Sequence, residues 1–212
     1  IGGGYEGQDS VPNAEITYVS SGSSLDGSGG ETGDGGSVIV WADDTTQFYG
    51  SVDAQGGTQS GDGGFVEISG KDQLVFRGDV QTTAAAGTTG TLLLDPTDII
   101  IAAGTGDGDS NGSSSTFIGD TNALLGQILE DDFPGGVVTL FESELEGLAG
   151  DTNIILEATN DIVLNDLPDA QLTFTAGTGS IRFTADGDFN LIDPTDTFIT
   201  NGRDLSLRGD SL

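Results

Sequence analysis

The chain has 212 residues, with 35 acidic and 5 basic side chains, so its formal net charge is −30. This balance excludes an ordinary nucleic-acid binder, because phosphate recognition needs clustered cations, and no apolar run approaches the length needed for membrane insertion. The absence of cysteine and histidine excludes disulfides, thiolate metal sites and catalytic triads that use either residue.

The first predicted elements come from a repeat with a spacing of 28 residues. Residues 35–40 (GGSVIV) align with residues 63–68 (GGFVEI), and the alignment continues without a gap to Phe48 on Phe76. A weaker third copy begins at Gly90, two residues early. Apolar residues alternate with polar ones inside each copy, which is the period of a β-strand. Such self-similarity indicates one structural unit stacked on itself.

We predict that the copies are coils of a parallel β-helix. At ~3.3 Å per extended residue, 28 residues give a perimeter of about 90 Å, and coils stack at roughly 4.8 Å. A stack of hairpins is less consistent with the long glycine- and aspartate-rich turns. The predicted core columns are Val38–Val66–Leu92 and Val40–Ile68–Leu94.

Three segments are expected along the chain. Residues 1–104 hold the coils of about 28 residues, and residues 105–150 hold an acidic loop with a short helical insertion near residues 121–131. A further helical turn is expected between Glu142 and Leu148. Residues 151–212 are predicted to return to narrower coils with a repeat of about 16–19 residues, with a separate β-sandwich as the alternative.

A possible calcium loop lies in the middle segment. Asp107, Asp109 and Asn111 precede Gly112 with the alternate spacing of oxygen ligands in a calcium-binding loop. The closing glutamate of that motif is missing, because Ile118 stands at its position. An ordinary acidic loop is the alternative.

Stacked aspartates form a second candidate calcium site. Asp34 lies over Asp62, and Asp44 lies over Asp72 and Asp98. Like charges one coil apart repel by on the order of 1 kcal/mol in water, and a bound cation removes that repulsion. The alternative is that these aspartates accept hydrogen bonds from backbone amides at turns. We expect no cofactor other than calcium.

The tripeptide Arg-Gly-Asp occurs at residues 77–79 and again at residues 208–210. Integrin recognition requires such a tripeptide at an exposed loop tip. Gly78 instead shares parity with Phe76 and Val80, and Gly209 follows two strand leucines in the same way. Both tripeptides are therefore predicted to be structural parts of strands.

Surface chemistry offers two weaker indications. Trp41 has the opposite parity to Val40 and is expected on the outer surface, where it is the best contact residue. Paired carboxylates hydrolyse glycosides in other proteins, but acidic pairs occur throughout this chain and none stands out. We therefore expect no enzyme, with a polysaccharide hydrolase or lyase as the alternative function.

A set of glycine-rich motifs covers roughly the first hundred residues: IGGGYEGQ at 1–8, VPNA at 11–14, GSVIVWAD at 36–43, GGFVEISGK at 63–71 and GTLLLDP at 90–96. Together they resemble filamentous-haemagglutinin-like exoproteins. The resemblance implies a right-handed parallel β-helix, export by two-partner secretion, and no catalytic residues.

The expected function follows from this resemblance. It implies an extracellular structural segment of a bacterial surface fibre or adhesin. Stacking end to end into filaments is expected through unpaired strands at the ends of the solenoid. A host-cell, matrix or carbohydrate surface is the expected partner besides a second copy of the chain.

Overall fold

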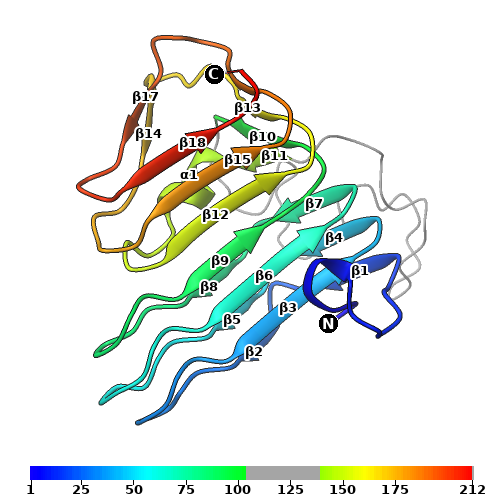
Figure 1. Ribbon diagram of the computed structural model, residues 1–212, viewed down its shortest axis with the longest axis vertical. Coiled ribbons are helices and arrows are strands. Elements are labelled where there is room, and N and C mark those ends of the chain that lie inside the picture. Colours follow the sequence, from blue (N-terminus) through cyan, green and yellow to red (C-terminus); the bar gives the residue numbers. More distant parts are fainter. Residues whose placement is uncertain (104–138, 212) are drawn as a thin grey trace.

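The computed structural model describes residues 1–103 and 139–211. They form a solenoid of about six turns built almost entirely from parallel strands (Figure 1). The predicted all-β parallel architecture is therefore confirmed, and the sandwich alternative for the last segment is wrong. The N-terminal coils lie at one end of the stack and the C-terminal coils at the other (Figure 1).

The first half of the solenoid has three strands per coil. A 3-10 turn, η1 (Tyr5–Gly7), precedes the strands. The strands are β1 (Ile16–Val19), β2 (Ser24–Asp26), β3 (Ser37–Ala42), β4 (Thr45–Phe48), β5 (Ser51–Asp53), β6 (Phe65–Gly70), β7 (Gln73–Phe76), β8 (Asp79–Gln81), β9 (Thr91–Leu94) and β10 (Ile99–Ala102).

The second half continues the same arrangement after one short helix. Its elements are β11 (Thr139–Phe141), α1 (Glu142–Glu146), β12 (Asn153–Ala158), β13 (Ile162–Leu164), β14 (Gln171–Thr173), β15 (Ile181–Ala185), β16 (Phe189–Leu191), β17 (Thr197–Ile199) and β18 (Leu205–Arg208). One six-stranded sheet, in the order β18-β15-β12-β9-β6-β3, runs the length of the stack. The other sides are formed by sheets β1-β4-β7, β11-β10-β13-β16, β2-β5-β8 and β14-β17.

The strand register confirms the predicted repeat in the first half. Val38 pairs with Val66 and Val66 pairs with Leu92, so the first core column stands as predicted. In the second half, Ile154 pairs with Ile181 at a spacing of 27 residues, and Ile181 pairs with Leu205 at a spacing of 24. The expected spacing of 16–19 residues is wrong, because it assumed two strands per coil where the chain keeps three.

Inward side chains fill the solenoid from one coil to the next. The rings of Phe48 and Phe76 stack with centroids 5.9 Å apart and an interplanar angle of 8°. Both rings are fully buried, as are Ile68, Leu94 and Phe183. Removing a large apolar side chain from water stabilises a fold by about 1.5–3 kcal/mol, so these columns are the main source of stability.

A wedge between coils joins the two halves. β11 pairs with β10 on one side and packs near β7 on the other, so it separates strands that adjacent coils would otherwise pair directly. α1 follows at once, which confirms the helical turn predicted after Glu142. The helical insertion predicted near residues 121–131 lies outside the described residues.

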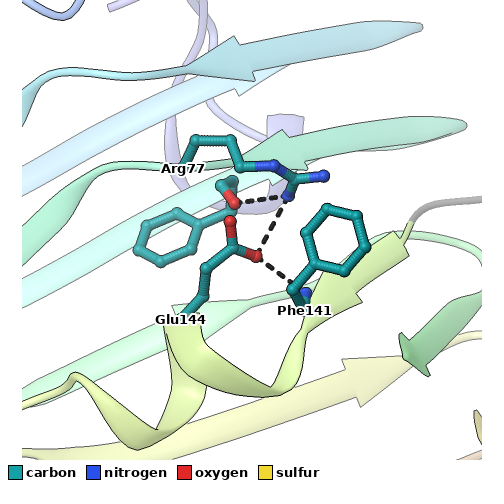
Figure 2. Close-up of polar contacts among 4 residues, drawn as sticks. Arg77, Phe141 and Glu144 are labelled. Atoms are coloured by element: carbon teal, nitrogen blue, oxygen red, sulfur yellow. Dashed lines mark hydrogen bonds and ion pairs between the residues drawn. The ribbon is translucent and has the colours of Figure 1, made fainter. Parts of the chain in front are cut away.

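A buried ion pair fastens this wedge to the first half. The Arg77 guanidinium lies 3.0 Å from Glu144 Oε2 and 4.4 Å from the centroid of the Phe141 ring (Figure 2). The same Glu144 oxygen accepts the backbone N–H of Phe141 at 2.8 Å. Burial raises the pKa of Glu144 to about 7, although the charge of Arg77 opposes the shift.

The N-terminal residues cover the outer face of β3. Ile1 donates through its ammonium group to Ile39 O at 2.6 Å and accepts the N–H of Trp41 at 2.9 Å, so it occupies part of the strand's free edge. Trp41 is only 5% exposed and donates through its indole N–H to Asp43 at 3.1 Å. The expectation of a surface tryptophan is wrong, because parity places it outside the solenoid but residues 1–14 then cover it.

Candidate functional site

The first predicted aspartate ladder is a hydrogen-bond ladder. Asp34 Oδ1 accepts the backbone N–H of Asp62 at 2.8 Å, and Asp62 Oδ1 accepts that of Thr88 at 2.7 Å in the next coil. The bonds from Thr88 hold the pKa of Asp62 below its usual range. The alternative of amide-bonding aspartates is thus confirmed for this ladder.

The second predicted ladder does not converge on one point. The carbonyl of Asp44 accepts the N–H of Asp72 at 3.1 Å, whereas Asp98 Oδ1 accepts from Asn160 Nδ2 at 2.7 Å and from the N–H of Asp161 at 3.2 Å. Within the described residues, no metal-binding group of acidic side chains includes any of the five predicted aspartates. Asp107, Asp109 and Asn111 lie outside those residues.

The first Arg-Gly-Asp tripeptide is structural, as predicted. A Cβ atom on Gly78 would lie 2.2 Å from the Phe48 ring, so the glycine faces the core. Its arginine is committed to Glu144. At the second tripeptide, Gly209 packs against the backbone of Phe189, while Arg208 and Asp210 are exposed.

An acidic cavity of about 350 Å³ lies beneath the N-terminal segment. Its lining includes Glu6, Trp41, Asp43, Lys71 and Asp95, which come from η1, β3 and the turns after β6 and β9. A second cavity of about 240 Å³ shares Glu6 and Asp95 with it. The two cavities form a charged area on the outer face of the long sheet.

Glu67 is an acidic residue that sequence reasoning missed in this region. It has no solvent exposure, and both of its carboxylate oxygens accept the N–H of Glu6, at 3.1 and 3.2 Å. Burial, with a smaller contribution from the charge of Asp95, raises the pKa of Glu67 to about 7. Its outward parity in β6, between Val66 and Ile68, is the signal by which it stands out.

Asp95 has a perturbed carboxyl group as well. Burial and the negative charges of Glu157, Glu6 and Asp186 raise the pKa of Asp95 to about 6. Two carboxyl groups that hold protons near neutral pH are able to act as general acids. The structure thus brings together a small acid–base area that the repeat pattern alone did not single out.

The C-terminal coil is the second candidate functional surface. β16, β17 and β18 each pair with a strand on one side only, within the part of the chain that the structure describes. Inward-facing residues in this coil are only partly buried, in contrast to the fully buried columns of the central coils. They are Leu191, Phe198, Leu205 and Leu207.

Comparisons with known proteins leave the family open. No protein-family model matches the chain, and a search of curated proteins finds no match. None of the helices in the described residues is long and apolar enough to cross a membrane. The functional argument therefore depends on the geometry of the two surfaces.

Proposed function

We propose that the chain is a rigid segment of a secreted bacterial surface fibre or adhesin, and that its coils stack end to end. The observation that carries this proposal is the C-terminal coil, which presents unpaired strands beside a partly exposed core. A parallel strand edge with apolar neighbours pairs readily with another chain. Stacking adds backbone hydrogen bonds and buries the four partly exposed residues.

The opposite end of the solenoid offers a partner surface. Leu25 in β2 and Val38 in β3 face the core but are only partly buried. The free sides of β1 and β2 are unpaired within the described residues. A second copy would place these strands on β16, β17 and β18, with apolar side chains opposed. Repetition of this head-to-tail contact builds an open filament.

The acidic composition suits the proposed location outside the cell. A net charge of −30 keeps such a shaft soluble, and salt screens the repulsion between stacked copies. Under this proposal the shaft holds adhesive surfaces away from the cell, towards a host-cell, matrix or carbohydrate partner. The secretion route and the resemblance to filamentous-haemagglutinin-like exoproteins belong to the same proposal.

Sedimentation and electron microscopy of the purified chain test the stacking. We expect concentration-dependent rods that grow along the solenoid axis. Leu205→Lys and Leu207→Lys place charges on the inward side of β18 and should abolish the rods. Ser206→Lys is the matched control, because it adds the same charge to the exposed side of the same strand. A monomeric wild type at high concentration, or equal assembly of all variants, would contradict the proposal.

A second candidate function is hydrolysis of a polysaccharide. The specific observation is the cavity beside Trp41 and Asp95, with Glu67 below the same N-terminal segment and both carboxyl pKa values raised. Release of reducing ends from a polysaccharide panel tests it. Activity lost in Asp95→Asn but kept in Asp204→Asn would favour an enzyme over a shaft, and no turnover on any substrate would remove this candidate.

A further inference from the structure

Three carboxylates meet where two turns of adjacent C-terminal coils lie next to each other. Asp166 lies in the turn between β13 and β14, and Asp193 and Asp196 lie in the turn between β16 and β17. One carboxylate oxygen from each residue lies within 4.8 Å of those of the other two. The three side chains are exposed, half-buried and buried in that order, so the cluster runs from solvent into the solenoid.

The buried member of the cluster lacks a hydrogen-bond partner for one oxygen. Asp196 is 6% exposed. Its Oδ2 accepts the N–H of Leu167 at 3.3 Å, next to Asp166 in the adjacent coil. Its Oδ1 is fully buried and has no hydrogen-bond partner. A buried carboxylate oxygen left unpaired is unfavourable unless a cation or another donor satisfies it.

No basic side chain neutralises this cluster. The five basic residues of the chain all lie in the described ranges, and the two ion pairs found there join Arg77 to Glu144 and Arg182 to Glu157. Arg203 donates to backbone carbonyls instead. The negative charge of three neighbouring carboxylates therefore remains uncompensated by the protein.

We propose that Asp166, Asp193 and Asp196 bind a calcium ion that joins the turn after β13 to the turn after β16. Calcium takes oxygen ligands at roughly 2.3–2.6 Å in flexible geometry, so two ligands on opposite sides of the ion lie about 4.6–5.2 Å apart. The 4.8 Å limit on the observed oxygen separations fits this range. Magnesium fits less well, because it requires shorter distances and a near-ideal octahedron.

Hydrogen bonds already orient one of the ligands. Asp193 Oδ1 accepts both the backbone N–H and the hydroxyl of Thr195 at 2.8 Å, and the backbone N–H of Asp196 donates to Asp193 O at 3.2 Å. These bonds hold the turn in one conformation before an ion arrives. The exposed position of Asp166 leaves space for water molecules to complete the coordination shell. The bound ion would fasten the last coil, whose strands have neighbours on one side only.

Calorimetric titration of the full-length chain with calcium chloride tests this site. We expect Asp166→Asn to weaken binding at this site by about 10-fold or more, because a carboxylate ligand is lost. Asp204→Asn, an exposed change of the same charge in the last coil, should leave the affinity unchanged. Asp166 is exposed, so this variant keeps the test valid even where Asp196→Asn fails to fold.

A thermal melt in calcium and in chelator provides the second readout. Ligand binding to the folded state alone raises its melting temperature. Calcium should raise the melting temperature of the wild type and of Asp204→Asn, and raise that of Asp166→Asn less. Magnesium should have a smaller effect. Equal calcium binding by wild type and Asp166→Asn, or no binding by either, would overturn the proposal.

Discussion

The two ends of the solenoid differ in how they finish the same stack of coils. At the N-terminal end, residues 1–14 return over β3, and Val40 and Trp41 are almost fully buried. At the C-terminal end, β18 has no strand beyond it in the described residues, and Leu205 and Leu207 remain partly exposed. The difference shows that a column of core residues depends on a neighbour above and below, not on its own apolarity.

The largest expected effect compares two positions in one column. Phe183 in β15 is fully buried and contacts the rings of Phe174, Phe189 and Phe198, each with centroids 6.2 Å away. It pairs with Leu207 in the last coil. Phe183→Ala should lower the free energy of unfolding by about 3–5 kcal/mol, as large-to-small changes in packed cores do.

Leu207→Ala is the matched change one coil further along. Because Leu207 is already partly exposed, we expect it to lower the free energy of unfolding by only about 1 kcal/mol. Denaturant unfolding of both variants at low protein concentration measures the difference. Equal losses would mean that the C-terminal coil is as well packed as the central coils, which would end the contrast.

The next largest effect compares two ion pairs in different surroundings. Arg77 and Glu144 have side chains 7% and 4% exposed, whereas Arg182 and Glu157 are 50% and 32% exposed. Arg77→Met at pH 8 leaves a buried carboxylate without its partner and should lower stability by about 3 kcal/mol. Arg182→Met should change stability by about 0–1 kcal/mol, because solvent already screens that pair.

Acidification separates charge from packing in this comparison. A proton on Glu144 removes the unpaired charge, so the loss in Arg77→Met should be smaller at pH 5 than at pH 8. Unfolding curves at both pH values provide the measurement. A loss that does not change with pH would assign the role of Arg77 to its contact with Phe141 and not to its charge.

The sequence predicted the central coils well because their residues repeat. Glycine, alternating valines and paired phenylalanines recur in register, so the columns from Val38 and Phe48 were visible without a structure. The second half lost that regularity, since its coils vary between 27 and 24 residues and apolar pairs on all three sides look alike. Counting every second pair in place of every third produced the wrong spacing.

The candidate sites were less visible because they depend on long-range contacts. Glu67 becomes buried only when Glu6, 61 residues earlier, is placed over it. The carboxylates of Asp166 and Asp196 meet through the stacking of two irregular turns that share no motif. The predicted ladders were found by register alone, but register does not reveal whether an aspartate faces a cation or a backbone amide.

The third prediction concerns the buried acid beneath the N-terminal cover. The pKa of Glu67 is raised from its usual 4.5 to about 7 in the folded state. The folded state therefore binds more protons than the unfolded state between these values, and stability falls as pH rises through them. Glu67→Gln should raise stability at pH 8 by about 1–3 kcal/mol and leave it unchanged below pH 4.

Unfolding by urea across this pH range measures the effect. The exposed Glu31→Gln is the control and should keep the wild-type pH dependence. A loss of stability at pH 8 in Glu67→Gln would show that the carboxylate's bonds to the Glu6 N–H outweigh its desolvation. The N-terminal cover would then depend on charge, and the open C-terminal coil would differ from it in chemistry as well as in packing.

The smallest effect compares turns in the two halves. Left-handed backbone positions in the turns of the early coils are occupied by glycine, as at Gly30 with φ 67°, whereas Ala170 holds φ 57° in a later coil. A Cβ atom makes this conformation unfavourable, so Ala170→Gly should raise stability by about 0.5–1 kcal/mol after the added chain entropy of glycine is subtracted. Ala185→Gly, in the buried strand β15, should lower stability instead. Thermal unfolding measures both changes, and a destabilised Ala170→Gly would show that contacts of the alanine methyl group, not backbone strain, dominate this turn.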